Sequence, residues 1–482
     1  MIKKLLKNFK KNLSSLIKFN KKRKILFLPL EIKTRELYPK LYFAKKALDQ
    51  NYSCFIGDKA GIFRATKYFN NGVYFYKSIN QTDTNHILKI KEKNNKYVVL
   101  DEEGGFTYIL DSEIKNFISH RSSKQNVGLI DRFFNWGKSD YSHYIKRYPT
   151  FKKKFIITGG LRFEVCKKSI VQKIYKDQIK NIKSEYGSDY TLIISSHGVT
   201  SLNVIKYLMK SDEYFMKLKT KKDKQTRYKV LFELYKLNKD FRDLIILILK
   251  KYPNQKFILR PHPSESVKDW NKFLSKDLKG SKNILIDSKN DLNALIFNSN
   301  GIINSKSAAS IQAQLQNKPV ISYTPKFLKY EPRVVDFLGH TCSTKQDVVK
   351  NFKKGIINKS LTKKNKESKI LSKNINNFNT KIEPSIIMLN EIKKIYKLRS
   401  KINILKILSL SPLYYFSDFF LKMAKLRYHS QQELAYKTVN EKISTEGIKR
   451  SEINNFFNNI NKTNNVKVLS FGKNCFFIYK KN

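Results

Sequence analysis

The sequence predicts an α/β protein with two doubly wound, Rossmann-like domains that face a cleft, followed by a helical C-terminal appendage. Short apolar runs recur between residues 24 and 323, and longer stretches with helical periodicity separate them. Continuous apolar strands that alternate with helices are typical of parallel sheets covered on both faces. The runs fall into two sets, one on either side of about residue 185, so we expect two sheets. At 482 residues, the chain is long enough for two domains and a further segment.

Domain boundaries follow from this alternation. We expect a basic amphipathic segment at residues 1–24, an N-terminal Rossmann-like domain at 25–185 and a second one at 186–350. Residues 351–482 are expected to hold a linker, helices and a small appendage, with the linker in the Lys-, Asn- and Ser-rich residues 353–377. The predicted strands are Lys24–Leu30, Cys54–Gly57, Tyr97–Glu103, Phe155–Gly160, Thr191–Ser196, Lys256–Pro263, Asn283–Ser288, Gly301–Ser305 and Lys318–Tyr323.

The charge of the chain limits its choice of partners. The sequence has 96 Lys and Arg residues against 39 Asp and Glu residues, a formal net charge of +57. Such a field attracts polyanions, acidic lipid surfaces and phosphorylated ligands, and it does not distinguish among them. Much of the excess is Lys accompanied by Asn and Ile, so the codon bias of an AT-rich genome is an alternative source. Apolar residues at 41% and aromatic residues at 13% favour buried cores over disorder.

The cysteines and the apolar runs indicate a protein of a reducing compartment. Cys54, Cys166, Cys342 and Cys475 lie far apart and form no C-x-x-C pair, so we expect neither a disulfide framework nor a metal site. No uncharged apolar run reaches the ~18 residues of a membrane span. The N-terminus has no continuous apolar region of the kind that signal peptides carry. We therefore expect a cytoplasmic protein.

Two amphipathic stretches are candidates for contact with a membrane surface. Residues 1–24 carry Leu and Ile at helical spacing with Lys between them, a pattern typical of helices in anionic membrane interfaces. Residues 402–423 are apolar and aromatic, but Pro412 and Asp418 interrupt them, which favours a surface-bound helical pair over a span. Packing against the protein's own core is the alternative for both stretches.

Polar side chains that follow apolar strands are the first candidates for a site, because open α/β sheets bind ligands at the C-terminal ends of their strands. Arg260 and His262 follow one such strand, and Pro261 and Pro263 stiffen the turn that holds them. This pair suits a phosphate oxygen, since Arg can give a bidentate contact and His a single donor. The alternative is a rigid turn with a surface His.

A serine-rich segment follows the strand that ends at Asn304. Ser305, Ser307 and Ser310 crowd the start of a predicted helix, where free backbone N–H groups favour an anion and small residues let a diphosphate approach. Ordinary capping of the helix by serine is the alternative. Together with the turn at His262, the segment predicts one phosphate-binding pocket in the second domain.

Two further segments end in residues that can face the cleft. Arg162 follows the pair Gly159–Gly160, and His197 follows the strand that begins at Thr191. Both can present cationic or polar groups to a ligand. A tight turn and a capped helix start are the structural alternatives.

Carboxylates are concentrated after two strands of the first domain. Glu31 follows the first strand, with Arg35 behind it, and Asp101, Glu102 and Glu103 follow another strand together with two glycines. Carboxylates at strand ends can act as a general base or a nucleophile, and neighbouring glycines allow a sugar to come close. The alternative is that these carboxylates form salt bridges with neighbouring Lys or Arg.

Several of these segments resemble a known family, the bacterial surface carbohydrate biosynthesis proteins. The run PLEIKTRELYPKLYFAKKAL resembles the family's opening E-x-K-x-R-E-L motif, and YVVLDEEGG, FNWGKSD and ITGGLRF follow in its order and spacing. In the last of these, Gly160, Leu161 and Glu164 stand where the family has Asn, Pro and Asp. RPHPSE and the serine-rich helix start are similar to donor-site motifs of capsule Kdo transferases and CDP-glycerol glycerophosphotransferases.

The resemblance covers about residues 24–345 and implies a GT-B-like architecture. It implies a donor site in the C-terminal lobe, an acceptor site in the N-terminal lobe and no bound metal. It also implies that His262, Ser305, Ser307 and Ser310 hold the nucleotide phosphates. Where related transferases often carry an acidic residue after the serines, this chain has Gln312 and Gln314.

We therefore predict a metal-independent glycosyltransferase of surface polysaccharide or lipid-linked glycan biosynthesis. We expect the donor to be a nucleotide sugar, a CMP-activated acidic sugar, and the acceptor to be a glycan or lipid-linked glycan, with no cofactor. The enzyme is expected to be cytoplasmic and peripheral to the inner face of the cytoplasmic membrane, with an anionic lipid surface as a partner. The predicted catalytic residues are Glu31, Glu102 and Glu103. The predicted binding and cleft residues are Arg260, His262, Ser305, Ser307, Ser310, Arg35, Asp101, Arg162 and His197.

Three alternatives stay open. A CDP-glycerol-type glycerophosphotransferase and a sugar-nucleotide epimerase fit the same motifs. A basic membrane-binding or nucleic-acid-binding protein is the non-enzymatic alternative. The cations are spread through every segment, and the sequence carries no RNA- or DNA-binding signature, so we do not expect a nucleic-acid partner.

Overall fold

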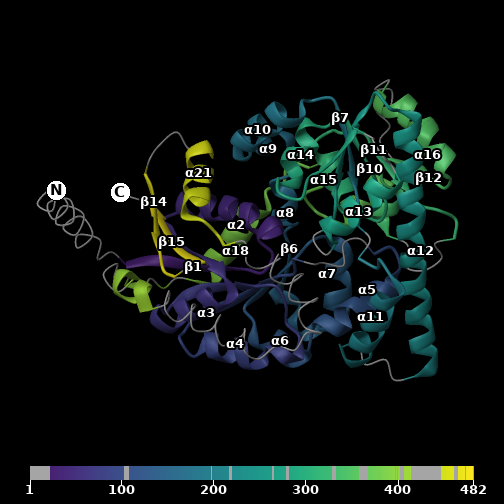
Figure 1. Cartoon of the computed structure of the whole chain (residues 1–482). Coiled ribbons are helices and arrows are strands. Elements are labelled where there is room, and N and C mark those ends of the chain that lie inside the picture. The colour runs from purple at the N-terminus through teal and green to yellow at the C-terminus, as the bar shows by residue number, and fades with distance from the viewer. Residues whose placement is uncertain are drawn as a thin grey trace, which may run out of the picture.

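The computed structural model has two α/β lobes (Figure 1). Among the residues that it describes, no helix is both long enough and apolar enough to cross a lipid bilayer. Cys54, Cys166, Cys342 and Cys475 are buried free thiols. The structure describes residues 22–102, 108–196, 198–215, 220–262, 265–277, 282–327, 333–357, 367–378, 380–396, 398, 400–401, 407–413, 447–460, 465–472 and 474–480.

The N-lobe is built on a sheet with the order β14-β15-β2-β1-β3-β4-β5-β6, and β13 pairs with the start of β1. Its first six strands in chain order pair with one another in parallel. These strands are β1 (Lys22–Leu30), β2 (Tyr52–Asp58), β3 (Gly72–Tyr76), β4 (Lys96–Leu100), β5 (Arg132–Asn135) and β6 (Phe155–Ile157). The N-lobe helices are α2 (Lys33–Leu48), α3 (Lys59–Tyr68), α4 (Thr84–Lys91), α5 (Asp111–Arg121), α6 (Lys124–Leu129), α7 (Lys138–Arg147) and α8 (Leu161–Glu164).

The apolar run of strand β1 is continuous because both faces of the strand are buried. Leu26 and Leu28 pack in one buried cluster, and Ile25 and Phe27 pack in another, because successive side chains point to opposite faces of a sheet. Both faces are therefore buried, as in other parallel sheets. The first cluster continues into the C-lobe through Leu192, so the two lobes share a buried apolar region.

The C-lobe sheet has the order β12-β11-β10-β7-β8-β9, and all its neighbouring strands are parallel. Counted from β9, this is the 3-2-1-4-5-6 order of a doubly wound fold, with its topological switch point between β7 and β10. The strands are β7 (Tyr190–Ile194), β8 (Lys256–Arg260), β9 (Ile284–Ile286), β10 (Gly301–Asn304), β11 (Val320–Tyr323) and β12 (His340–Cys342). The helices of this part of the chain are α9 (Lys168–Ile174), α10 (Lys176–Tyr186), α11 (Leu202–Phe215), α12 (Lys221–Lys251), α13 (Val267–Asp277), α14 (Leu292–Asn298), α15 (Ala309–Leu315) and α16 (Lys345–Asn351).

The C-terminal part of the chain returns to the N-lobe. It contributes helices, as predicted, and also a β-hairpin that the sequence analysis did not predict. Strand β15 of this hairpin pairs antiparallel with β2 and extends the N-lobe sheet. The elements are α17 (Glu367–Asn374), α18 (Pro384–Ile395), β13 (Ser400–Lys401), α21 (Arg450–Ile460), β14 (Val466–Ser470) and β15 (Cys475–Lys480).

The described end of the predicted linker, residues 367–377, packs against the N-lobe instead of running through solvent. The Asn377 side chain is fully buried and accepts a hydrogen bond from the Gly160 N–H (3.1 Å) and donates one to the Gly160 carbonyl (3.2 Å). The backbone of Asn376 donates to the carbonyl of Trp136 (2.7 Å). An Asn-rich composition indicates a solvated loop, but here the polar side chain satisfies a buried backbone.

Each of the nine predicted strand segments contains a strand, and β3, β5, β12 and β13 were not predicted, nor was the β14–β15 hairpin. Residues 1–21 of the predicted membrane-surface segment lie outside the described residues. Of the second such stretch, residues 402–423, only 407–413 are described.

Candidate functional site

A cavity of about 460 Å³ opens between the two lobes. Its C-lobe wall includes residues that directly follow β7, β8 and β10, among them Ser195, His262 and Lys306. Its N-lobe wall includes Arg35 at the start of α2 and Arg162 in α8. The cavity lies at the topological switch point, where open α/β sheets bind ligands. The turn at His262 and the segment after Asn304 thus meet on one cavity.

Cationic side chains from both lobes line this cavity. The pKa of His262 is lowered by burial first, and further by the neighbouring charges of Arg162 and Arg35. The pKa of Arg162 is lowered by burial and by Arg35. These groups oppose one another's positive charge, so an anion bound among them would relieve the repulsion. Arg162 also donates to Gln312 of the C-lobe (Nη2 to Oε1, 3.4 Å), a contact between the lobes.

Arg260 lines the cavity but is also engaged behind it. Its Nη1 donates to the backbone carbonyl of Asp287 (3.1 Å) and to Oδ1 of the same residue (3.4 Å). Its pKa is lowered by burial and raised in part by Asp287. The ion pair fixes the guanidinium at the end of β8, so Arg260 is a positioned cation.

A buried carboxylate that the sequence analysis did not identify holds the turn after β8. Glu265 accepts hydrogen bonds from Ser195 Oγ (2.7 Å) at Oε1 and from Trp270 Nε1 (2.7 Å) at Oε2. The backbone N–H of His262 also donates to Oε2 (3.3 Å). Glu265 therefore ties the segments that follow β7 and β8 together. The sequence signal that could have identified Glu265 was its place at the end of the R-P-H-P-S-E segment, three residues after His262.

The three predicted phosphate-binding serines differ in position. Ser307 lines the cavity, whereas Ser305 and Ser310 are fully buried and are not part of its wall. The Ser310 hydroxyl donates to the Ser307 carbonyl (2.6 Å), which closes the turn that begins α15. Between Ser305 and Ser307, Lys306 has a φ of 54°, which is left-handed and uncommon for a residue with a side chain. The side chain of Lys306, which lines the cavity, was not a predicted site residue.

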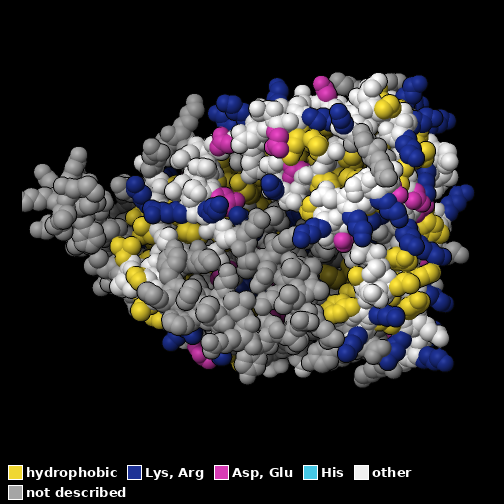
Figure 2. Space-filling model, viewed as in Figure 1, with side chains coloured by type: hydrophobic (Ala, Val, Ile, Leu, Met, Phe, Trp, Pro, Cys, Tyr) yellow, Lys and Arg dark blue, Asp and Glu magenta, His cyan; other side chains and the backbone are white. Residues whose placement is uncertain are grey.

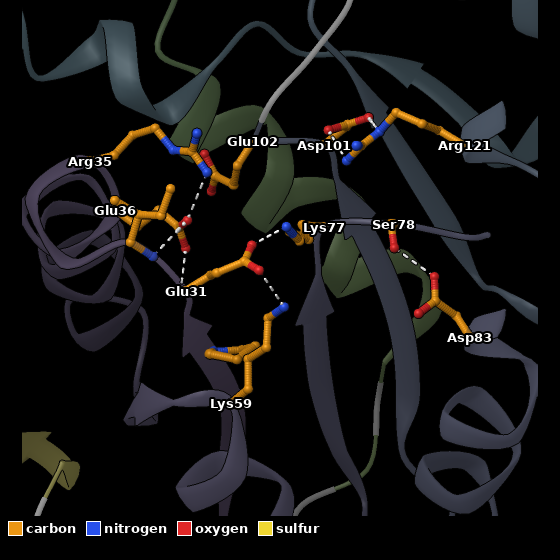
Figure 3. A network of polar contacts seen from close by, with 12 residues as sticks. Glu31, Arg35, Glu36, Lys59, Lys77, Ser78, Asp83, Asp101, Glu102 and Arg121 are labelled. Atoms are coloured by element: carbon orange, nitrogen blue, oxygen red, sulfur yellow. Dashed lines mark hydrogen bonds and ion pairs between the residues drawn. The ribbon is translucent and has the colours of Figure 1, made fainter. Parts of the chain in front are cut away.

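The N-lobe carboxylates form a separate charged network (Figure 3). Glu31 Oε1 pairs with Lys59 (2.9 Å), and Oε2 pairs with Lys77. Burial alone would raise the pKa of Glu31, but the two lysines outweigh it, and the pKa is lowered. Glu31 thus forms salt bridges, the alternative that the sequence left open.

Glu36, which was not a predicted site residue, organises the start of α2. It accepts from the backbone N–H groups of Glu31 (3.0 Å) and Ile32 (3.2 Å) and pairs with Arg35 (3.2 Å) and Lys40 (2.9 Å). Burial opposes ionisation, but Lys40 and Arg35 outweigh it and lower the pKa of Glu36 to about 2. This network fixes Arg35 at the cavity.

Glu102 is the buried carboxylate with the weakest compensation in this network. It is 2% exposed, and its Oε1 lies 3.5 Å from Lys40 Nζ. Burial raises its pKa, and the charge of Glu36 adds to the rise while Lys40 and Arg35 reduce it. Glu102 lines a recess of about 10 Å³, enough for about one water, together with Glu31 and Glu36. Figure 3 places Arg35, a residue of the large cavity, beside Glu102.

The remaining predicted cleft residues have other positions. Asp101 receives a bidentate contact from Arg121 (2.8 and 2.9 Å), and its carbonyl accepts from Trp136 Nε1 (2.5 Å), so it supports the fold. Glu103 and His197 lie outside the described residues. Arg162 reaches the cavity from the turn that the two glycines make.

The glycines before Arg162 are required by packing. A Cβ on Gly160 would lie 2.1 Å from the Trp136 ring, and Gly159 has a φ of +94°. Neither position accepts a larger side chain without rearrangement. The pair therefore has a structural role, and Arg162 provides the cation.

A carboxylate that the sequence analysis missed lines the same cavity. Asp291 caps α14 by accepting from the Asn293 N–H (2.8 Å), and burial raises its pKa to about 6. Arg260 lies close enough to reduce this rise. In the sequence, Asp291 directly before Leu292 was a signal for the start of a helix, but it gave no sign that Asp291 lies at the cleft.

No family model and no curated protein matches this chain. Several solved structures are similar to it at low identity. The UDP-GlcNAc 2-epimerase from Neisseria meningitidis bound to UDP-GlcNAc matches with a TM-score of 0.48 and 13% identity, over 77% of this chain and 100% of that one. A putative UDP-N-acetylglucosamine 2-epimerase from Listeria monocytogenes gives 0.49 and 11%, over 78% and 97%. The wall teichoic acid polymerase TagF gives 0.47 and 14%, over 77% and 88%.

These likenesses concern the fold and do not identify a reaction. The strand orders of the two lobes, with a cavity between them, give the GT-B-like fold class predicted from the sequence. This part of the prediction is confirmed.

Proposed function

We propose that the chain is a GT-B-type glycosyltransferase that moves a sugar from a nucleotide-activated donor to a glycan or lipid-linked acceptor of surface polysaccharide synthesis. One observation carries this proposal: cations from both lobes meet on a cavity at the switch point of the C-lobe sheet. Arg35 and Arg162 come from the N-lobe, and Arg260, His262 and Lys306 come from the C-lobe. Ligands of open α/β sheets bind at such points.

The C-lobe cations suit the phosphate that leaves with the nucleotide. Transfer breaks the bond between the sugar and a phosphate oxygen, and negative charge develops on that oxygen. Arg260 and Lys306 supply positive charge, and His262, whose pKa is lowered, supplies a neutral imidazole donor. Groups already fixed around the developing charge stabilise the transition state without reorganising.

The N-lobe cations favour an acidic sugar, and a CMP-activated acidic sugar is our proposed donor. Such a donor carries one phosphate and one carboxylate at separate positions. The cations of the cavity are likewise divided between two walls, with Arg35 and Arg162 opposite the C-lobe group. A guanidinium matches a carboxylate through two parallel hydrogen bonds. The cavity volume of about 460 Å³ falls in the range of small-molecule sites.

Glu102 is the proposed general base for the acceptor hydroxyl. Its pKa is raised by burial, and a carboxylate with a raised pKa accepts a proton more readily near neutral pH. Glu31 is less suited to this role because two lysines neutralise it. Lys40 and Arg35 would stabilise Glu102 in its ionised form until the proton arrives.

The alternative reactions differ in their ligand and in their need for an acceptor. A CDP-glycerol transferase would bind CDP-glycerol in preference to CMP-sugars. A sugar-nucleotide epimerase would bind a UDP-sugar and convert it without any acceptor. Asp291, a second carboxylate with a raised pKa on the cavity wall, gives an epimerase a further proton-transfer group.

A ligand panel tests the proposal. Isothermal titration of the purified protein with CMP, CDP-glycerol, UDP and pyrophosphate is expected to give the tightest binding for CMP. The double variant R162M/H262A is expected to weaken CMP binding by at least tenfold with little change in melting temperature, because it removes donors that face the cavity. A matched double variant, R147M/H120A, changes the same residue types elsewhere in the N-lobe and should bind as the wild type does. Equal binding by all three proteins, or no nucleotide binding by the wild type, would overturn the proposal.

A further inference from the structure

A long helical hairpin extends from the C-lobe. Helix α12 has 31 residues, a length of about 46 Å, and α11 packs against its N-terminal half. The C-terminal half of α12 contributes Phe241, Leu244 and Ile248 to the main C-lobe core. The N-terminal half contributes Leu231 to a small separate cluster with Ile205 of α11. In Figure 1, this half of α12 lies beside α11, away from the C-lobe sheet.

The hairpin exposes large apolar side chains. Leu202 is 48% exposed, Tyr207 is 46% exposed and Tyr228 is 47% exposed. Phe232 and Tyr235, which are partly buried, continue the apolar face along α12. In Figure 2, apolar side chains over α11 and α12 stand among Lys and Arg side chains. Tyr and Leu on a helical surface are typical of elements that enter a membrane interface.

The hairpin is also strongly cationic. Residues 202–215 and 220–239 carry nine Lys and Arg against four Asp and Glu, an excess of five positive charges. Eight of the nine are Lys, which attracts lipid phosphates as a point charge. Each Lys near an anionic surface adds to binding, and the contributions accumulate. The cations are Lys206, Lys210, Lys221, Lys222, Lys224, Arg227, Lys229, Lys236 and Lys239.

The aromatic rings of the hairpin are arranged in a way that favours lipid over nucleic acid. Tyr228 and Phe232 stack on each other, with ring centroids 6.0 Å apart and an interplanar angle of 11°. Lys236 lies over the Phe232 ring (5.0 Å), and Lys239 lies over the Tyr235 ring (4.8 Å). Base stacking needs an open ring face, and the Phe232 and Tyr235 rings are contacted by these side chains of the protein itself. Entry into a lipid headgroup region needs only an exposed apolar edge.

We propose that the α11–α12 hairpin is a docking surface for an anionic lipid bilayer, with Leu202, Tyr207 and Tyr228 in the headgroup region and the lysines on lipid phosphates. The inference rests on the proposed function, since a lipid-linked acceptor is presented at such a surface. Helix α11 begins six residues after Ser196, which lines the cavity, so at most about 20 Å of chain separates the two. Docking would hold the cavity close to the acceptor.

Flotation with vesicles tests the charge contribution. The full-length protein is expected to bind vesicles of phosphatidylcholine with about 30% phosphatidylglycerol and to leave pure phosphatidylcholine vesicles unbound. The variant K206Q/K222Q/K229Q is expected to bind the anionic vesicles about 100-fold more weakly. The control K89Q/K93Q/K115Q removes three exposed lysines from N-lobe helices and their flanks and should bind like the wild type. Equal loss in both variants, or no loss in the hairpin variant, would overturn the proposal.

A conservative tryptophan at the surface tests insertion directly. The two native tryptophans, Trp136 and Trp270, are each 1% exposed and give a constant background. In Y228W, brominated lipid is expected to quench the new fluorescence and shift it to shorter wavelength. The control Y68W, at a tyrosine that is 39% exposed on the N-lobe, should be unaffected. Quenching at position 68 with none at position 228 would place the lipid contact elsewhere and overturn the proposal.

A competing ligand separates this proposal from nucleic-acid binding and from the proposed function. Poly(U) is expected to bind weakly and without dependence on Tyr228. If poly(U) binds tightly, Y228S weakens it and vesicles do not bind, the hairpin is a nucleic-acid surface and the lipid proposal fails. Vesicle binding is measured without nucleotide, and CMP binding is measured without lipid. A failure of one is therefore distinct from a failure of the other.

Discussion

The two walls of the cleft balance their charges in different ways. On the cavity, Arg162 and His262 both have a pKa lowered by burial and by neighbouring cations. Behind the N-lobe wall, Glu31 and Glu36 each pair with two cations, and their pKa values are lowered. The cations of the cavity repel one another, and an anionic ligand would reduce that repulsion. The N-lobe carboxylates, in contrast, are already neutralised by cations of the protein.

Glu102 is the exception within the N-lobe network, and it makes the comparison useful. It is buried in the same recess as Glu36, and both lie near Lys40, yet the pKa of Glu102 is raised and that of Glu36 is lowered. The difference follows from geometry, since Glu36 has two backbone donors and a closer Lys40 contact (2.9 Å against 3.5 Å). A carboxylate that the fold does not fully satisfy is a better candidate for chemistry than one that it does.

The largest expected effect follows from this contrast. E102Q should reduce sugar transfer by about 10²- to 10⁴-fold, because it removes the proposed general base. CMP binding should stay within about twofold of wild type, since phosphate recognition lies on the C-lobe. Steady-state transfer rates and isothermal titration measure the two quantities.

The matched control for this variant is E31Q. Glu31 is neutralised by Lys59 and Lys77, so its removal should lower transfer by less than about tenfold. A larger loss of transfer in E31Q than in E102Q would make Glu31 the better candidate for the general base. It would also contradict the idea that the less neutralised carboxylate carries the chemistry.

Replacing Glu36 and replacing Glu102, the two buried carboxylates near Lys40, should change the stability of the fold in opposite directions. E36Q should lower the free energy of unfolding by about 3 kcal/mol, because it removes the carboxylate closest to the buried Lys40 ammonium group. The contribution of Glu36 is present above about pH 4.5 and is lost as the pH falls toward 2, since its folded-state pKa is the lower one. E102Q should leave the melting temperature unchanged or raise it. Urea titrations at pH 7 and pH 3 give both results.

The cavity wall supplies a third test. R162M should weaken the binding of a CMP-activated acidic sugar by about 10- to 100-fold, the loss expected when a charge-assisted contact to its carboxylate is removed, and it should change CMP binding much less. It should also raise the pKa of His262, because one of the two cations that lower that pKa is gone. Titration by NMR of the His262 ring follows the second change. An unchanged His262 pKa would mean that the two groups do not share an electrostatic environment.

Much of the fold could be predicted because local patterns carry it. The apolar strands of both sheets and the polar ends that form the C-lobe wall were visible in sequence. Strands β5 and β12 were missed because their sequences, RFFN and HTC, contain polar residues and give no continuous apolar run, whereas the equally short FII and ILI do. The β14–β15 hairpin was missed because β15 pairs with β2, more than 400 positions earlier, which no local signal reports.

The site was predictable in its cations and less so in its carboxylates. Arg162, Arg260 and His262 follow strands, and strand ends converge by topology. Glu36 and Asp291 were missed because their roles depend on side-chain partners that only the folded chain brings together. Glu31 was over-weighted for the same reason, since the lysines that neutralise it come from α3 and from the segment after β3. Position along a strand predicts where a carboxylate lies and does not predict how well it is compensated.

The smallest expected effect tests that rule at a third buried carboxylate, Glu164. It accepts from the backbone N–H (3.0 Å) and the hydroxyl (2.7 Å) of Ser385, and burial raises its pKa to about 7. The folded protein therefore keeps this proton to higher pH than the unfolded chain does, so the free energy of unfolding should fall as pH rises from about 4.5 to about 7. E164Q should remove this part of the pH dependence and gain about 1 kcal/mol relative to wild type at pH 8. The difference between the two unfolding curves across pH 4 to 8 isolates the contribution of Glu164, and a flat difference would mean that Ser385 compensates the charge as fully as Lys40 compensates Glu36.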